Sequence, residues 1–106
     1  MSEPRHIIFD RHGNRIAWSK FGVIWFENGD RVGSFAGDKI LNNQNHLVAR
    51  LIYDRVETLQ GDRLGLIVPD EESGKFFIKM DDYTVGNQSY PKALAAGIIG
   101  LLHKHI

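Results

Sequence analysis

The sequence contains no cysteine, which excludes a disulfide framework and every metal site built from thiolates. Long apolar runs are also missing, since no stretch approaches the roughly 18 apolar residues that cross a bilayer as a helix. The opening residues lack the apolar segment and the small-residue cleavage site of a secretory signal. We therefore expect a soluble, cytoplasmic protein.

An excess of either charge is missing as well. The 13 Lys and Arg residues balance the 13 Asp and Glu residues, and the two signs are interspersed along the chain. Such a pattern creates no long-range field that would gather nucleic-acid phosphates or anionic lipids. We expect no nucleic-acid partner and no membrane partner. At 106 residues the chain is long enough to bury its own core, so we expect a single domain over residues 1–106.

What the sequence does contain is a 16-residue unit written four times without a gap, at residues 7–22, 23–38, 39–54 and 55–70. In every copy the second and tenth positions carry an aliphatic residue, and the seventh carries Gly or Asn, which tolerate a positive φ. The eleventh position holds only alanine or glycine: Ala17, Gly33, Ala49 and Gly65. Each copy is therefore predicted to be one β-hairpin, giving eight short antiparallel strands.

Two turn types are compatible with each hairpin. One is a two-residue type I′ turn, as Asn28-Gly29 suggests, and the other is a three-residue turn that ends in a left-handed residue and a bulge. We favour the second, because it pairs the second position with the tenth and places both on one face. A further turn signal joins successive copies, at Phe21-Gly22, Gly37-Asp38, Tyr53-Asp54 and Pro69-Asp70.

The small eleventh position predicts how the hairpins assemble. A lone hairpin is marginal in water, so the four must share one core. If equivalent strands converge on a pseudo-fourfold axis, only Ala or Gly at the innermost position lets the backbones approach. The expected fold is mainly β, with four antiparallel β-hairpins in a pseudo-fourfold arrangement, followed by one extra strand and a C-terminal α-helix.

Two segments, residues 9–18 and residues 23–29, resemble the four-fold beta flower domain family. They are similar to the family's strand, glycine turn and valine-alanine-aromatic return, and the likeness extends from Ile7 to about Ile67. Arg50 and Leu66 depart from the pattern, since an aromatic residue is usual there. The resemblance implies four hairpins set around an axis, and it implies no activity.

The repeat ends at residue 70. Residues 71–74 read as a polar turn, residues 75–80 as one more strand and residues 81–88 as a loop. Ser89 is predicted to cap a helix from Pro91 to His105, because serine accepts from free N–H groups and proline is tolerated in the first turn.

Apolar residues surround most of this helix, so it is predicted to be buried on more than one side. Two roles stay open. The helix closes the hairpin assembly, or it forms the interface of a homo-oligomer. The candidate interface residues are Leu94, Ile98, Ile99, Leu101 and Leu102.

Three arginines share the ninth position of the repeat: Arg15, Arg31 and Arg63. In a fourfold arrangement they would form most of a ring, and a ring of guanidinium groups suits a carboxylate or phosphate ligand. The alternative is that each arginine faces solvent and pairs with a nearby carboxylate.

Aromatic side chains crowd the first two copies of the repeat. They are Phe9, Trp18, Phe21, Trp25, Phe26 and Phe35. The third and fourth copies have only Tyr53. These rings either form a stacking platform on the surface or belong to the core.

Recognisable catalytic motifs are missing. No serine sits in a strained glycine elbow or beside a recognisable His and Asp, and no phosphate-binding loop or HExxH motif occurs. His103 and His105 would point to different faces of a helix, which disfavours a metal site. We expect a noncatalytic protein without a metal or cofactor. It is predicted to bind an unknown protein partner or itself, through the helix or an aromatic face. The alternative is a pocket protein that holds a small anionic ligand near the axis with Arg15, Arg31 and Arg63.

Overall fold

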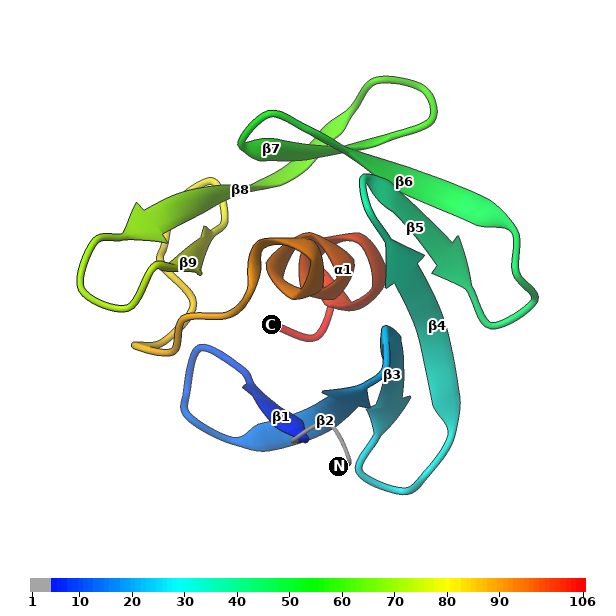
Figure 1. The fold of residues 1–106 in the computed structure, drawn as a ribbon, viewed down its shortest axis with the longest axis horizontal. Helices are drawn as coiled ribbons and strands as arrows, with labels where there is room; N and C mark the ends of the chain where they lie inside the picture. The colour runs from blue at the N-terminus through cyan, green and yellow to red at the C-terminus, as the bar shows by residue number, and fades with distance from the viewer. Residues whose placement is uncertain (1–4) are drawn as a thin grey trace.

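In a computed structural model that describes residues 5–106, the chain forms a meander of nine antiparallel strands followed by one helix (Figure 1). The first four residues of the predicted domain lie outside the described part. The elements are β1 (His6–Phe9), β2 (Arg15–Lys20), β3 (Val23–Phe26), β4 (Arg31–Ala36), β5 (Lys39–Asn42), β6 (Leu47–Ile52), β7 (Arg55–Thr58), β8 (Arg63–Asp70), β9 (Lys75–Lys79) and α1 (Lys92–Leu102). Strands neighbouring in sequence are neighbours in the sheet, in the order β1 to β9. The predicted mainly-β fold is confirmed.

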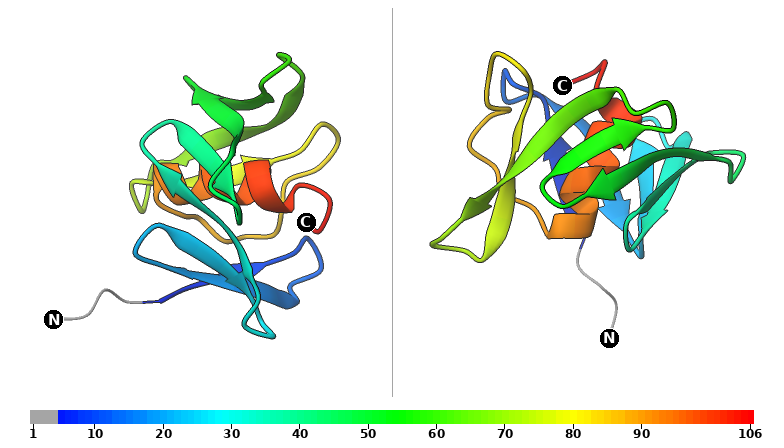
Figure 2. Two further views of the ribbon diagram at one scale, coloured as in Figure 1. Left: turned by 90° about the vertical axis from the view of Figure 1, so that its right-hand side faces the viewer. Right: turned by 90° about the horizontal axis from the view of Figure 1, so that it is seen from above.

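The sheet curls around α1 as a half-barrel, with the helix at its centre (Figure 1). Side and top views show the helix enclosed between the first hairpin and the later ones (Figure 2). Among residues 5–106 the curl does not close, because β1 and β9 each pair with one strand only. No helix within residues 5–106 is long and apolar enough to span a bilayer.

All four repeats form the three-residue turn rather than the two-residue alternative. In the first hairpin the Gly13 N–H donates to the Asp10 carbonyl over 3.1 Å, and the Asp10 N–H donates to the Asn14 carbonyl over 2.9 Å. The same pair of bonds recurs 16, 32 and 48 residues later. The seventh residue has a positive φ in every turn, and Asn45 adopts it at +64° without being glycine. The preferred turn is therefore confirmed.

The predicted register within each hairpin is wrong by one residue. The second position pairs with the eleventh, not the tenth: Ile8↔Ala17, Ile24↔Gly33, Ile40↔Ala49 and Val56↔Gly65. The cause is a bulge in every hairpin. In the first one, Phe9 pairs with Arg15 and Ile8 with Ala17, so Ile16 has no partner across the ladder. The four bulged residues, Ile16, Val32, Val48 and Leu64, are partly buried and pack against the core.

Three of the four predicted turns between copies are present. Lys20 pairs with Val23, Ala36 with Lys39 and Ile52 with Arg55, so each of these connections has two residues. The prediction of a fourth turn at Pro69-Asp70 is wrong. These residues belong to β8, which continues because β9 pairs with it as far as Asp70↔Lys75. The chain turns afterwards, where the Asp70 carboxylate accepts from the Ser73 hydroxyl over 2.6 Å.

The small residues at the eleventh position make room for α1, and not for one another as expected. A Cβ added to Gly33 would clash with the Leu41 carbonyl oxygen of the neighbouring strand β5 and would lie 2.8 Å from Cδ1 of Leu101 on the helix. One added to Gly65 would lie 3.1 Å from Cγ2 of Ile99. The helix contributes matching small residues, since a Cβ on Gly100 would lie 3.3 Å from the Cβ of Ala49. The predicted meeting of bare hairpins at an axis is corrected: α1 fills that centre.

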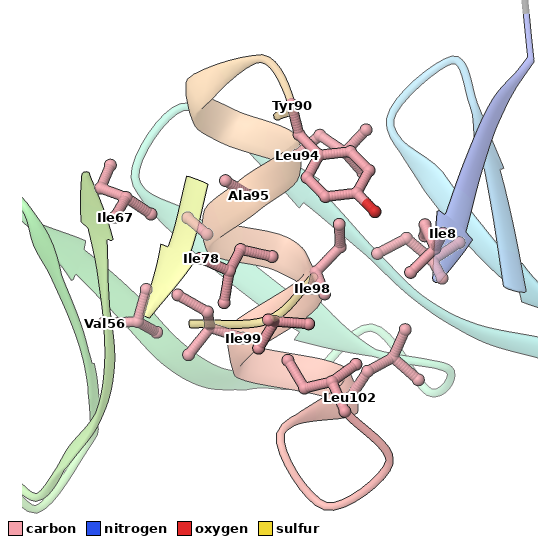
Figure 3. Packing of buried hydrophobic residues seen from close by; sticks show 14 of the residues in the cluster. Ile8, Val56, Ile67, Ile78, Tyr90, Leu94, Ala95, Ile98, Ile99 and Leu102 are labelled. Atoms are coloured by element: carbon pink, nitrogen blue, oxygen red, sulfur yellow. The ribbon is translucent and has the colours of Figure 1, made fainter. Parts of the chain in front are cut away.

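The helix closes the core, which confirms the first of its two predicted roles. Leu94, Ile98, Ile99 and Leu102 are at most 2% exposed. They pack against inward side chains of the sheet, among them Val56 and Ile78 (Figure 3). This burial on several sides explains how the chain tolerates two glycines in a short helix.

The helix is shorter than predicted, and its start is set differently. No side chain caps it, and the Ser89 hydroxyl lies 3.2 Å from the Ser73 hydroxyl instead. Tyr90 fixes the start, because its N–H and carbonyl both pair with Phe76 of β9 over 2.8 Å. At the other end, the His105 and Ile106 N–H groups fold back onto the Leu102 carbonyl, which ends the regular helix before His105.

Candidate functional site

An aromatic face covers the outside of the first three strands. Successive side chains of a strand point to opposite faces, so Ile8 and Ile24 face the core while Ile7 and Trp25 face outward. Trp18 lies between these two across the sheet, paired with Ile7 on β1 and Trp25 on β3. The two indole rings are stacked, with centroids 4.3 Å apart and planes 20° apart. We call Ile7, Trp18 and Trp25 the aromatic face.

Two cations flank the aromatic face. The Arg5 guanidinium lies 4.1 Å from the ring centroid of Trp18, and the Lys20 ammonium lies 5.3 Å from that of Phe21, which is 66% exposed. The ion pairs within residues 5–106 are Arg15–Glu27, Arg55–Glu57 and Arg63–Asp81. Neither Arg5 nor Lys20 therefore pairs with a carboxylate of the described residues. Arg5 places its positive charge beside an indole ring, and Lys20 places its charge beside the exposed ring of Phe21.

Of the aromatic side chains in the first two copies, some point into the core and others lie on the surface, so each of the two predicted placements occurs. Phe26 and Phe35 point inward, Phe26 with its ring edge-on to His105 at 5.4 Å and Phe35 against Gly97 of the helix. The tryptophans lie outside and are partly buried. Inward and outward rings alternate along the strands, which explains why the sequence alone left both roles open.

The three arginines of the ninth position are exposed, and each contacts a polar residue in a later turn or loop of the chain. Arg15 Nε lies 3.3 Å from Glu27 Oε1, Arg31 Nη2 donates to Asn45 Oδ1 over 3.3 Å, and Arg63 Nη2 donates to Asp81 Oδ1 over 3.3 Å. The structure thus gives the three guanidinium groups separate partners instead of bringing them together. Because α1 fills the centre of the sheet, anion binding there by these arginines stays a prediction without structural support.

The predicted interface residues of the helix are already packed within one chain. Four of the five are core residues, and Leu101 is partly buried against Gly33. An oligomer that uses them requires α1 to leave its own sheet and enter that of another copy. Self-assembly through the helix therefore stays a prediction, and it would require two copies to exchange their α1 helices.

A seam remains where the curled sheet fails to close. The turn of the first hairpin faces the segment from Tyr83 to Gln88 and the residues after α1, and three hollows of about 210, 350 and 560 Å³ lie along it. Arg11 lines all three hollows. Beside the seam, the Tyr90 side chain links the segment before α1 to β1: its buried hydroxyl accepts from the Phe9 N–H over 3.3 Å and points toward β1 (Figure 3). This burial raises the pKa of Tyr90.

Sequence reasoning missed the seam. Its charged groups come from the first turn and from the residues after the helix, which are far apart in the chain. The Arg11 guanidinium lies 4.8 Å from the Tyr83 ring centroid. The Asp10 carboxylate accepts from the His12 and Asn14 N–H groups, each over 2.9 Å, and these hydrogen bonds lower the pKa of Asp10. The one available signal was that Arg11-His12 is the only basic pair at its place in the repeat.

Among residues 5–106 there is no group of three or more His, Asp or Glu side chains placed to hold a metal ion. Comparison with known proteins adds no relative: no family model, curated protein or solved structure matches the chain.

Proposed function

We propose that this protein is a noncatalytic interaction module whose aromatic face binds an extended, acidic segment of a partner protein. The observation that carries the proposal is the tryptophan stack on the outside of the sheet. Tryptophan and arginine dominate the binding energy of protein interfaces, and both occur together here. The chain places its only two tryptophans in this one cluster instead of in its core.

The charge beside the stack selects the kind of partner. Arg5 and Lys20 are not neutralised by carboxylates of residues 5–106, so a partner that presents carboxylates beside an apolar anchor is complementary. The strand edge near His6 and Ile7 favours an extended partner, because β1 pairs only with β2 among residues 5–106. At Phe9 the edge is already used, since its N–H donates to the Tyr90 hydroxyl.

The site is also held rigidly before binding. Trp18 lies on β2, which is paired on both sides, and each indole restricts the other by stacking. A preorganised surface loses less conformational entropy when a partner binds. We also propose that the chain is a four-fold beta flower domain located in the cytoplasm. The shared register of the four hairpins supports the family, and the lack of cysteine suits the location.

Selection from a random peptide display library, followed by fluorescence titration, tests the proposal. We expect enriched peptides that combine Asp or Glu with apolar residues, and binding should change the tryptophan emission directly. The variant Trp25→Thr should weaken binding by at least about tenfold, since it removes half of the stack. Lys20→Glu should shift the enriched peptides toward basic residues.

The repeat supplies a matched control. Leu41 occupies the same repeat position as Trp25 one hairpin later and is similarly half-buried, so Leu41→Thr should leave peptide binding unchanged. Melting temperatures of both variants distinguish lost binding from lost folding. If no peptide is enriched, or if folded Trp25→Thr binds as well as the unmodified protein, the proposal is wrong.

A further inference from the structure

The seam differs from the aromatic face in both shape and chemistry. The aromatic face is the outside of a sheet, whereas the seam is a hollow in which basic side chains from two distant segments meet. We propose that the seam binds the phosphate group of a small phosphate ester.

The basic groups come from the first turn and from the residues after α1. Arg11 and His12 line the hollow of about 210 Å³ on one side, and His103, Lys104 and His105 line it on the other. Arginine and lysine provide charge-assisted hydrogen bonds to phosphate oxygens. The Arg11 Nε–H donates to His12 Nε2 over 3.3 Å, which leaves the two terminal Nη groups of the guanidinium for a ligand. The Tyr83 ring beneath Arg11 holds the guanidinium in place, so the group is oriented before a ligand arrives.

The Asp10 carboxylate, which also lines this hollow, and two carbonyl oxygens near the end of the helix are already paired with protein donors. The Asp10 carboxylate accepts two backbone N–H groups of its own turn. The Ile99 carbonyl lies 3.0 Å from His103 Nδ1, and the Leu102 carbonyl accepts the His105 and Ile106 N–H groups. Two of the carbonyl oxygens near the end of the helix are therefore already paired within the protein.

The neighbouring hollow sets the class of ligand. It has a volume of about 350 Å³, and its walls include Gly13, Gly86, Asn87 and Gln88. The glycines leave backbone groups accessible, and the two amide side chains both donate and accept hydrogen bonds. Hydroxyl groups suit such walls, so the body of the ligand is a small hydroxylated molecule that extends from the phosphate.

Titration of the ¹⁵N-labelled protein with inorganic phosphate and with glycerol phosphate tests this site. Chloride at equal ionic strength is the reference, because it controls for screening. We expect saturable shifts of the amides near residues 11–13, 86–88 and 103–106. The ester should bind several-fold more tightly than inorganic phosphate, and Asn87→Ala should remove that advantage.

Three arginine variants separate this site from the alternative at the ninth repeat position. Arg11→Gln should weaken phosphate binding by at least about tenfold. Arg15→Gln, an equally exposed arginine, should bind within about twofold of the unmodified protein. Arg11→Lys should fall between, since it keeps the charge and loses the two-pronged geometry.

Shifts that do not saturate, undiminished binding by Arg11→Gln, or equal affinities for ester and inorganic phosphate would overturn the assignment. The two proposals fail separately, because the peptide experiment reads the tryptophans and this one reads amides along the seam.

Discussion

The first two hairpins and the last two have the same backbone and opposite outer surfaces. On the inside, all four pair an aliphatic residue with Ala or Gly in one register. On the outside, the first pair presents the stacked indoles of Trp18 and Trp25. The last pair presents Arg50 opposite Glu57, and Glu57 also forms an ion pair with Arg55 that raises the pKa of the arginine. The two faces of the repeat are therefore under different constraints. The inner face must pack against the helix in all four hairpins, whereas the outer face carries different side chains in each pair.

The largest effects are expected where the inner face is broken. Ile24→Ala and Ile40→Ala each remove a side chain that is at most 1% exposed, so each should lower the free energy of unfolding by about 2–5 kcal/mol. Urea denaturation measures both values. Similar losses would confirm that the two hairpins are equivalent on the inside. A loss at Ile40 below half of that at Ile24 would contradict the equivalence.

A smaller effect, on the pH dependence of stability, is expected to distinguish the turns of the first and third hairpins. Asp10 and Asn42 occupy the same repeat position, and each accepts two backbone N–H groups of its turn, but only Asp10 titrates. The pKa of Asp10 is lowered in the folded protein from 3.8, so its stabilisation is present above pH 3.8 and is lost as the pH falls through the folded value. The variant Asp10→Asn should keep the turn, and its stability should fall less than that of the unmodified protein as the pH is lowered.

Melting temperatures of the unmodified protein and of Asp10→Asn, recorded from about pH 2 to 6, measure this difference. Some acid sensitivity should survive in the variant, because the pKa of Asp70 is also lowered, chiefly by the Ser73 hydroxyl. Identical pH profiles for the two proteins would show that the Asp10 carboxylate contributes nothing to the stability of its turn.

The smallest effect is expected for the arginines that link neighbouring turns. Arg15→Gln and Arg63→Gln each break an ion pair whose two side chains are at least 42% exposed, so each should change stability by less than about 0.5 kcal/mol. Chemical denaturation in low and high salt measures the change. A loss above about 1 kcal/mol would mean that these links hold the hairpins together, which the comparison assigns to the inner face.

The fold was largely predictable because the repeat shows the same turn residues and apolar positions four times at equal spacing. Any one glycine turn could be misread, but Gly13, Gly29, Asn45 and Gly61 at equal spacing predict the same turn four times. The register escaped prediction, since the bulged residues are ordinary aliphatic residues such as Ile16 and Val32, and no special residue type marks them. The role of the eleventh position was misassigned for a related reason: a small residue shows that something approaches closely, and not which element does so.

The candidate sites were harder to predict, because each depends on placement in space. The two tryptophans stand out in the sequence, yet only the strand register shows that both face outward. The seam depends on how far the sheet curls, which brings Arg11 near Tyr83 from the opposite end of the chain. No pattern of neighbouring residues in the sequence predicts how far the sheet curls.

The order of the elements has a consequence for how the chain is made. Each strand can pair with the one before it as soon as it leaves the ribosome, so the meander forms through local contacts. The element that covers Ile24, Ile40 and Val56 is synthesised after all nine strands. A nascent chain that stops before residue 92 therefore carries a bare apolar lining, and such chains should depend on chaperones or aggregate until the helix arrives.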